Sequence, residues 1–260
     1  MRKERQIFVY GDEKTGVPGC INNGIDEKTA NKIYDEMIDF AKYAFNKSHA
    51  AAYAVVAYQT AYLKFYYPVE FMAALMTSVI ENPPKVAEYI YACRQMDIHI
   101  LPPDINRGIA SFSVDGGNIR YGLAAIKSIG KPVIEQIEAE RKEFGPFKNL
   151  EDFISRMSVK DILNKKVIEN FIKSGALDCL GGTRKQYMSI YIQIMEHVNQ
   201  EKKYAMTGQM TLFDLVDEEQ KSEFEIKLPD VGEYAKENLL AFEKEVLGIY
   251  ISGHPLKESE

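Results

Sequence analysis

Two stretches of the chain share one pattern: residues 124–141, "AAIKSIGKPVIEQIEAER", and residues 167–191, "VIENFIKSGALDCLGGTRKQYMSIY". Each reads as a short helix, a turn that contains glycine, and a longer helix. In the first turn Gly130 can take a tight or left-handed backbone conformation, and Pro132 suits the start of the helix that follows. Two such units in tandem predict a compact block of four helices.

Both turns combine free backbone N–H groups with basic side chains. The N–H groups at a helix start can hold a phosphate oxygen without reading any base. The sequence therefore predicts contacts with a nucleic-acid backbone at two places. The candidate residues are Lys127, Ser128, Ile129, Gly130 and Lys131 in the first turn, and Gly182, Thr183, Arg184 and Lys185 in the second. The alternative interpretation is two ordinary helical hairpins with solvated lysines.

Composition and charge do not argue against this prediction. The 260 residues are 46% hydrophobic and 27% charged, which is typical of a soluble globular protein, and the net charge is −6. That charge is uneven: residues 120–185 hold 13 Lys and Arg against 9 Asp and Glu, whereas residues 201–260 hold 7 against 14. The basic surplus thus lies in the segment that carries both turns, and the acidic surplus lies in the tail.

Several protein classes are disfavoured by the sequence. Cys20, Cys93 and Cys179 are far apart and form no CxxC pair, which favours reduced thiols over disulfides or a zinc site. There is no apolar run of 18 residues and no apolar signal core near the N-terminus, so we expect a cytoplasmic protein without a membrane span. No GxxxxGK[ST], HExxH or GxSxG motif is present, and no metal site is predicted.

The remainder of the chain is mainly helical. Helices are predicted at residues 26–44, 48–66, 69–79 and 236–247, with a further helix after "ENPP". The double-proline segment "ILPPDINRG" at residues 100–108 predicts a connector and a domain boundary. Just after it, "SFSVDGGNIRYGL" places Asp-Gly-Gly-Asn between two alternating apolar runs, which predicts a β-hairpin. The predicted fold class is mainly α with one small hairpin.

The helix predicted at residues 48–66 has an unusual start. Between Ala50 and Leu63 it carries no charge, so we expect it to be buried or packed on something large. Its first residues are polar: Asn46 or Ser48 can cap the helix, and Lys47 and His49 stand at its positive end. Ammonium, imidazole and helix dipole together suit a phosphate. The alternative is a solvated lysine and a satisfied histidine at an ordinary helix start.

The acidic segment after residue 205 contains an isolated apolar pair. In "GQMTLFD", residues 208–214, Leu212 and Phe213 stand among polar residues with little predicted regular structure. They can anchor a loop on its own domain. Alternatively, Gln209 forms a hydrogen bond on a partner while the Leu-Phe pair fills an apolar pocket there. The sequence leaves these two alternatives open at this point.

Five segments of the chain resemble consecutive segments of one protein family. They are "FNKSHAAAYAVVAYQTAYLKFYYPVEFMAALMTS", "ILPPDINRG", "FSVDGGNIRYGLAAIKSIG", "NFIKSGALD" and "LGIYISGHPL". In this order they resemble the alpha subunits of bacterial DNA polymerase III, the family C replicative polymerases. The resemblance spans essentially the whole chain.

The resemblance implies a different role for each of four sequence ranges. It implies the C-terminal part of the polymerase fingers at 1–100, a tandem helix-hairpin-helix DNA-binding module at 101–205, an irregular acidic segment with a clamp-binding peptide at 206–235, and a helix and linker towards an OB-fold domain at 236–260. Asn46, Lys47, Ser48 and His49 would then bind nucleotide or template. The peptide that binds the sliding clamp would be Gln209, Met210, Thr211, Leu212 and Phe213.

The implied function is that of one part of a DNA-directed DNA polymerase, which adds dNMP from dNTP to a primer 3′ end. Family C polymerases hold their catalytic aspartates in a palm domain upstream, so we expect a fragment that is inactive alone and binds no cofactor, with Mg²⁺ serving the whole enzyme. The implied partners are duplex primer–template DNA, dNTP, the sliding clamp and other replisome subunits. One alternative is a non-enzymatic helical protein-interaction module. A small-molecule phosphotransferase using Lys47 and His49 is disfavoured, because no carboxylate cluster or phosphate loop accompanies them.

Overall fold

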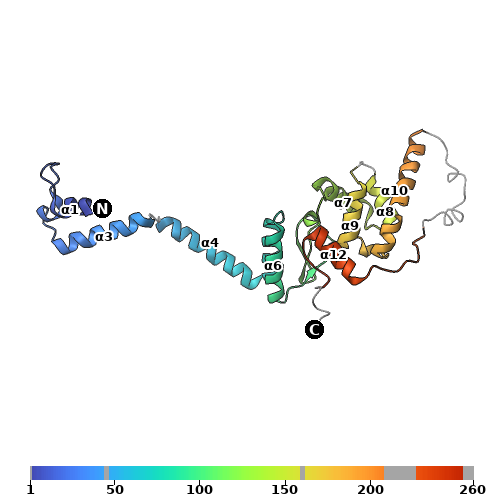
Figure 1. The fold of residues 1–260 in the computed structure, drawn as a ribbon, viewed down its shortest axis with the longest axis horizontal. Coiled ribbons are helices and arrows are strands. Elements are labelled where there is room, and N and C mark those ends of the chain that lie inside the picture. Colours follow the sequence, from blue (N-terminus) through green and yellow to red (C-terminus); the bar gives the residue numbers. More distant parts are fainter. Residues whose placement is uncertain (1, 44–46, 159–161, 208–226, 254–260) are drawn as a thin grey trace. The chain divides into compact units, whose positions relative to one another are not determined.

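The computed structural model describes residues 2–43, 47–158, 162–207 and 227–253. The chain forms two compact units, Met1–Tyr62 and Leu63–Glu260. The first unit contains α1 (Arg2–Tyr10), α2 (Gly19–Asn22), α3 (Glu27–Tyr43) and most of α4 (Lys47–Tyr66). The mainly α fold class predicted from the sequence is confirmed (Figure 1).

The first unit has a small core around Val9, Ala30 and Tyr34. The start of α3 follows from its sequence: the Asp26 carboxylate accepts a hydrogen bond from the Thr29 N–H at 3.0 Å, which satisfies one of the free donors at the helix start. The rings of Phe8 and Tyr34 lie 5.4 Å apart and join α1 to α3. Few side chains are buried in this unit, so its stability depends on a small apolar area.

Helix α4 forms where it was predicted, but the described part of the chain does not bury it. None of its residues is buried, and Phe65 is 77% exposed. Its apolar side chains surround the helix instead of forming one stripe, and a helix of that kind needs partners on more than one side. The expectation of burial is therefore wrong for the residues that the structure describes.

The second unit contains the other helices and one sheet. The α-helices are α5 (Pro68–Ser78), α6 (Pro83–Gln95), α7 (Lys131–Phe144), α8 (Leu150–Met157), α9 (Lys165–Ser174), α10 (Arg184–Thr207) and α12 (Lys236–Leu247), and the 3₁₀ turns are η1 (Leu123–Ala125) and η3 (Asp178–Leu180). Asparagine side chains cap three of the helices by accepting a backbone N–H: Asn82 at α6, Asn149 at α8 and Asn164 at α9. Helix α9 packs against α10 and α12, and α10 also packs against α8 (Figure 1).

The sheet contains the predicted hairpin and one further strand. Its strands are β1 (Ile100–Leu101), β2 (Ser113–Asp115) and β3 (Asn118–Arg120), in the order β1-β3-β2. Between β2 and β3, Gly116 and Gly117 have φ angles of 60° and 80°, the left-handed pair that a two-residue hairpin turn requires. Strand β1 runs parallel to β3. It was not predicted, because two residues before a double proline carry no strand periodicity.

One hydrophobic core extends through the second unit, from Met72 in α5 to Ile249 after α12. The double-proline segment lies inside it, since Ile105 is fully buried and its N–H donates to the Ala176 carbonyl at 3.0 Å. The structure therefore divides the chain between Tyr62 and Leu63, and residues 100–108 are an internal connection of the second unit. The roles assigned to the four sequence ranges remain predictions.

Within the described residues, no helix has both the length and the apolar character that crossing a membrane would need.

Candidate nucleic-acid interface

The first turn, residues 127–131, presents two lysines on the protein surface. Ile129 is buried and anchors the turn, while Lys127, Ser128 and Lys131 are exposed. The turn is closed by Ser128, which has a φ of 63°, a left-handed conformation that is uncommon outside glycine. One apolar side chain thus holds the loop, and its cations face outwards.

The backbone of Lys127 is held from both sides. Its N–H donates to the Val246 carbonyl in α12 at 2.9 Å, and its carbonyl accepts the Asn170 Nδ2–H of α9 at 2.6 Å. Asn170 itself is fully buried. Two hydrogen bonds to two different helices fix the position from which the exposed Lys127 side chain extends.

The start of α7 is open at this turn. Gly130 is its N-cap, and no side chain in the described residues accepts a hydrogen bond as a cap there. Lys131 is 84% exposed, and its Nζ lies 3.6 Å from the carboxylate of Glu135, which is also exposed. An exposed i,i+4 pair of this kind is worth only about 0.3–0.5 kcal/mol, so Lys131 remains available to another anion.

The second turn, residues 181–185, is built with the same residue types but closed differently. Gly182 fits because a Cβ there would lie 2.5 Å from the Tyr187 ring, and its N–H donates to the Tyr187 hydroxyl at 2.6 Å. Thr183 and Gln186 form a reciprocal capping box at the start of α10, with Thr183 N–H donating to Gln186 Oε1 and Gln186 N–H to Thr183 Oγ1.

A carboxylate of the same chain occupies the start of α10. Glu233 accepts the N–H of Arg184 at 2.9 Å and that of Lys185 at 3.0 Å, and the Thr183 hydroxyl donates to the Gly232 carbonyl at 2.6 Å. A helix start favours a negative charge, and here Glu233 supplies it. The N–H groups that the sequence offered to a phosphate are engaged internally.

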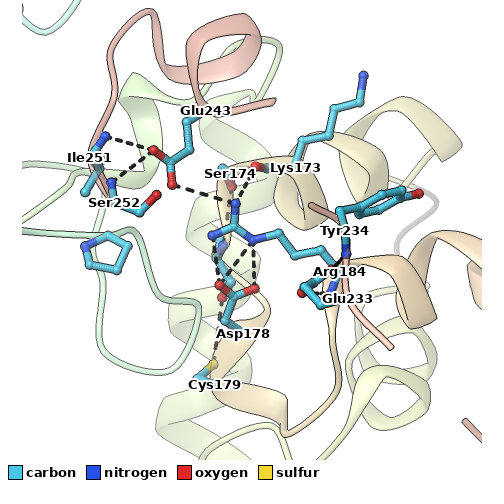
Figure 2. A network of polar contacts seen from close by, with 12 residues as sticks. Lys173, Ser174, Asp178, Cys179, Arg184, Glu233, Tyr234, Glu243, Ile251 and Ser252 are labelled. Atoms are coloured by element: carbon cyan, nitrogen blue, oxygen red, sulfur yellow. Dashed lines mark hydrogen bonds and ion pairs between the residues drawn. The ribbon is translucent and has the colours of Figure 1, made fainter. Parts of the chain in front are cut away.

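The Arg184 side chain points into the protein. It is 8% exposed, and its guanidinium lies between two carboxylates, as Figure 2 shows. Arg184 Nη2 donates to Asp178 Oδ2 at 2.9 Å, and its Nη1 lies 3.8 Å from Glu243 Oε1. Nη1 also donates to the backbone carbonyl of Lys173. The geometry does not favour Arg184 as a surface contact.

Glu243 ties this network to the segment after α12. It is 1% exposed and accepts the backbone N–H groups of Ile251 at 2.8 Å and Ser252 at 3.0 Å (Figure 2). Sequence reasoning missed Asp178, Glu233 and Glu243 as partners of the second turn. Glu233 and Glu243 belong to the acidic tail, and no local spacing relates either residue to the turn.

The other predicted site residues lie elsewhere. Lys47, Ser48 and His49 are exposed at the start of α4 in the first unit, and the His49 ring lies 4.3 Å from that of Tyr53. Asn46 and the predicted clamp-binding residues 209–213 lie outside the described residues. In the described ranges, no three His, Cys, Asp or Glu side chains gather as a group that could hold a metal. The Mg²⁺ that the resemblance implies is thus given no ligand set among these residues.

The region that contains both turns matches the model of a known motif. The family model of the helix-hairpin-helix motif matches residues 97–187, which contain both turns. The chain as a whole is similar to DNA polymerase III subunit alpha: it is 43% identical to that of Deinococcus radiodurans over 100% of its length, 42% to that of Vibrio cholerae over 99%, and 40% to that of Escherichia coli K12 over 99%. The predicted resemblance is confirmed. The chain spans about a fifth of the length of these curated relatives (19%, 22% and 22%).

Proposed function

We propose that this chain grips duplex DNA through its phosphate backbone, as part of a replicative DNA polymerase. The observation that carries the proposal is the first turn. Lys127 and Lys131 are exposed there on a backbone fixed by Asn170 and Val246, within the region that matches the helix-hairpin-helix model. Contacts of this kind fix the position of a duplex and carry no base recognition.

The two turns have unequal roles in this proposal. The second turn is not assigned to DNA, because Glu233 occupies its N–H groups and Arg184 is buried against Asp178 and Glu243. Its role is to join the hairpin module to the segment that follows α10. The grip is therefore assigned to the first turn and the surface next to it.

The proposed grip predicts a characteristic salt dependence. Each phosphate that a lysine neutralises releases counterions, so log K should fall with log salt by about 0.9 for each contact. Binding should be independent of sequence, since neither Lys127 nor Lys131 has a rigid fork geometry that would favour one base edge.

Fluorescence anisotropy with a random-sequence duplex, measured over a series of salt concentrations, tests this function. The variant Lys127→Ala, Lys131→Ala should bind about tenfold more weakly at about 0.1 M salt, with a slope of log K reduced by about 2. Lys185→Ala, in the second turn, is the control for loss of one lysine outside the first turn and should stay near wild type. Equal affinity of the double variant and wild type would overturn the assignment to the first turn. A wild-type chain that binds no duplex would favour the interaction-module alternative.

The polymerase context extends the proposal to the whole protein. By similarity to DNA polymerase III subunit alpha, we assign the chain to an enzyme that adds dNMP from dNTP to a primer end and that acts with Mg²⁺ and other replisome subunits. Contact with nucleotide or template is proposed for Asn46, Lys47, Ser48 and His49, whose described members are exposed at the start of α4. This chain is proposed to supply binding and not the catalytic carboxylates.

A sliding clamp is proposed as a further partner, through Gln209, Met210, Thr211, Leu212 and Phe213. The support is the Gln-x-x-Leu-Phe pattern in a chain similar to a replicative polymerase. Such a tether would raise processivity by effective concentration. Surface plasmon resonance on an immobilised bacterial clamp should detect binding by wild type and none by Leu212→Ala, Phe213→Ala. Binding that survives in the double variant would contradict the motif.

A further inference from the structure

Lysines from two elements act electrostatically on one glutamate beside the first turn, and one of them is hydrogen-bonded to it. In α9, Lys173 places its Nζ 2.8 Å from both carboxylate oxygens of Glu245 in α12. The backbone of Lys127 meets the same two helices, at Asn170 in α9 and at Val246, the residue after Glu245, in α12. The first turn, α9 and α12 thus converge where this carboxylate stands.

The helical geometry of α9 adds a third lysine to the cluster. Asn170 follows Lys166 by four residues and precedes Lys173 by three, so all three lie on the face of α9 that meets the first turn. Lys166 is 56% exposed. The pKa of Glu245 is lowered by its hydrogen bond from Lys173, with Lys166 and Lys127 contributing, which agrees with this placement.

The charges of the cluster leave a positive surplus. Against Lys127, Lys166 and Lys173 stand Glu245 and one further carboxylate, Glu169, which lies 4.0 Å from Lys166 and accepts the Tyr191 hydroxyl. Three positive charges face two negative ones. Neutralising Glu245 alone would raise the surplus from one to two.

We propose that Lys127 and Lys166, which are exposed, together with Lys173, which is 14% exposed, extend the phosphate-backbone contact for duplex DNA beyond the first turn, with Glu245, hydrogen-bonded to Lys173, as the internal counter-ion of the cluster when DNA is absent. This inference rests on the proposed DNA-binding function and extends its surface from the first turn across α9. The cluster adjoins the first turn, and its charge is complementary to a polyanion. A DNA phosphate that binds here replaces the Glu245 carboxylate as the anionic partner of the lysines.

The test compares two variants that remove the same charge from α12. Glu245→Gln removes the counter-ion of the cluster, and Glu237→Gln removes an exposed carboxylate in the first turn of the same helix. Both alter the net charge equally, so any long-range effect is shared. We expect Glu245→Gln to bind random duplex about threefold more tightly than Glu237→Gln at about 0.1 M salt, because the local surplus doubles. Equal affinity of the two variants would overturn the inference and leave the Lys173–Glu245 pair a purely structural contact.

A second pair of variants keeps the test decisive if Glu245→Gln disturbs the packing of α9 on α12. The ion pair of Lys166 is with Glu169 of its own helix, and its influence on Glu245 is electrostatic, so Lys166→Ala leaves the packing of α9 on α12 in place. We expect it to weaken duplex binding about threefold and to lower the salt slope by about 1. Lys165→Ala, one residue away on α9, is the control. Affinity of Lys166→Ala equal to that of Lys165→Ala would overturn the inference. Failure of the proposed function looks different, because then even the first-turn double variant would bind like wild type.

Discussion

The two turns of this protein consist of similar residues but differ in the exposure of their basic side chains. Each places glycine before a helix that begins with a basic residue, Lys131 in α7 and Arg184 in α10. At the first turn Lys131 is 84% exposed, whereas at the second Arg184 is 8% exposed and held between carboxylates. The α7 start has no side-chain cap among the described residues, whereas the α10 start carries both a capping box and Glu233.

The difference shows that a turn motif determines the backbone conformation of the loop. Residues distant in sequence determine whether its N–H groups and basic side chains are free to bind a phosphate. The segment around α12 contacts both turns. At the first it contributes a backbone carbonyl, that of Val246, which steadies the loop and leaves its cations exposed. At the second, Glu233 and Glu243 neutralise the N–H groups and the guanidinium. Among the described residues, the first turn keeps exposed cations, whereas the arginine of the second turn is buried against carboxylates.

The largest effect should follow from removing Arg184. Arg184→Ala leaves Glu243, which is 1% exposed, without its cationic neighbour inside the protein. Breaking one side of a buried charged network typically costs about 3–5 kcal/mol, and the two backbone N–H groups that Glu243 retains favour the lower end of that range. Urea unfolding of the whole chain measures this cost.

The control for this prediction is Lys185→Ala, the neighbouring residue, whose loss should change the free energy of unfolding by about 0.5 kcal/mol or less. A cost below about 1 kcal/mol for Arg184→Ala would show that the network in Figure 2 contributes little to stability. The second turn would then be less tightly joined to the segment after α12 than its contacts indicate.

Local sequence signals were sufficient for most elements of the fold. The helix predicted at 236–247 is found as Lys236–Leu247, the Asp-Gly-Gly-Asn hairpin forms, and Asp26 caps α3. These features depend on residues within a few positions of one another. Strand β1 does not, because its two residues become a strand only by pairing with β3. The boundary predicted beside it stays a prediction, while the compact units of the structure divide between Tyr62 and Leu63.

For the candidate site, the sequence predicted the cations but not their partners. That Lys127 and Lys131 flank a glycine turn is visible in the sequence, and their exposure follows from the turn. The pairing of Glu233 with the Arg184 N–H spans 49 positions and has no periodic signature. The same holds for helix α4, because its apolar run predicted a helix but did not identify the surface against which that helix packs.

The next effect in size concerns Glu233, whose carboxylate lies at the N-terminus of α10. Glu233→Gln keeps the length of the side chain but removes its charge, and a single amide oxygen cannot serve the Arg184 and Lys185 N–H groups as two carboxylate oxygens do. We expect a loss of about 1 kcal/mol in the free energy of unfolding, typical of a helix N-terminal partner. Asp230→Asn removes the same charge from an exposed side chain nearby and should cost about 0.5 kcal/mol or less. Equal stability of the two variants would show that Glu233 does not close the second turn.

The smallest effect is expected at Ser128, in a comparison of the backbones of the two turns. Ser128 has a φ of 63° at the first turn, and Gly181 has a φ of 87° at the second. Gly181→Ala meets no atom within 4 Å of the new Cβ, so its cost is conformational and about 1 kcal/mol. Ser128→Gly relieves a left-handed serine but frees the unfolded chain, which leaves a net gain of a few tenths of a kcal/mol.

Thermal unfolding of both variants beside wild type tests the direction of each change. We expect Ser128→Gly to raise the stability and Gly181→Ala to lower it. Such a result would show that the first turn holds a serine where glycine would be slightly more stable, at the loop that we assign to DNA. A lower stability of both variants would instead show that a contact of the Ser128 side chain stabilises the turn by more than its left-handed backbone costs.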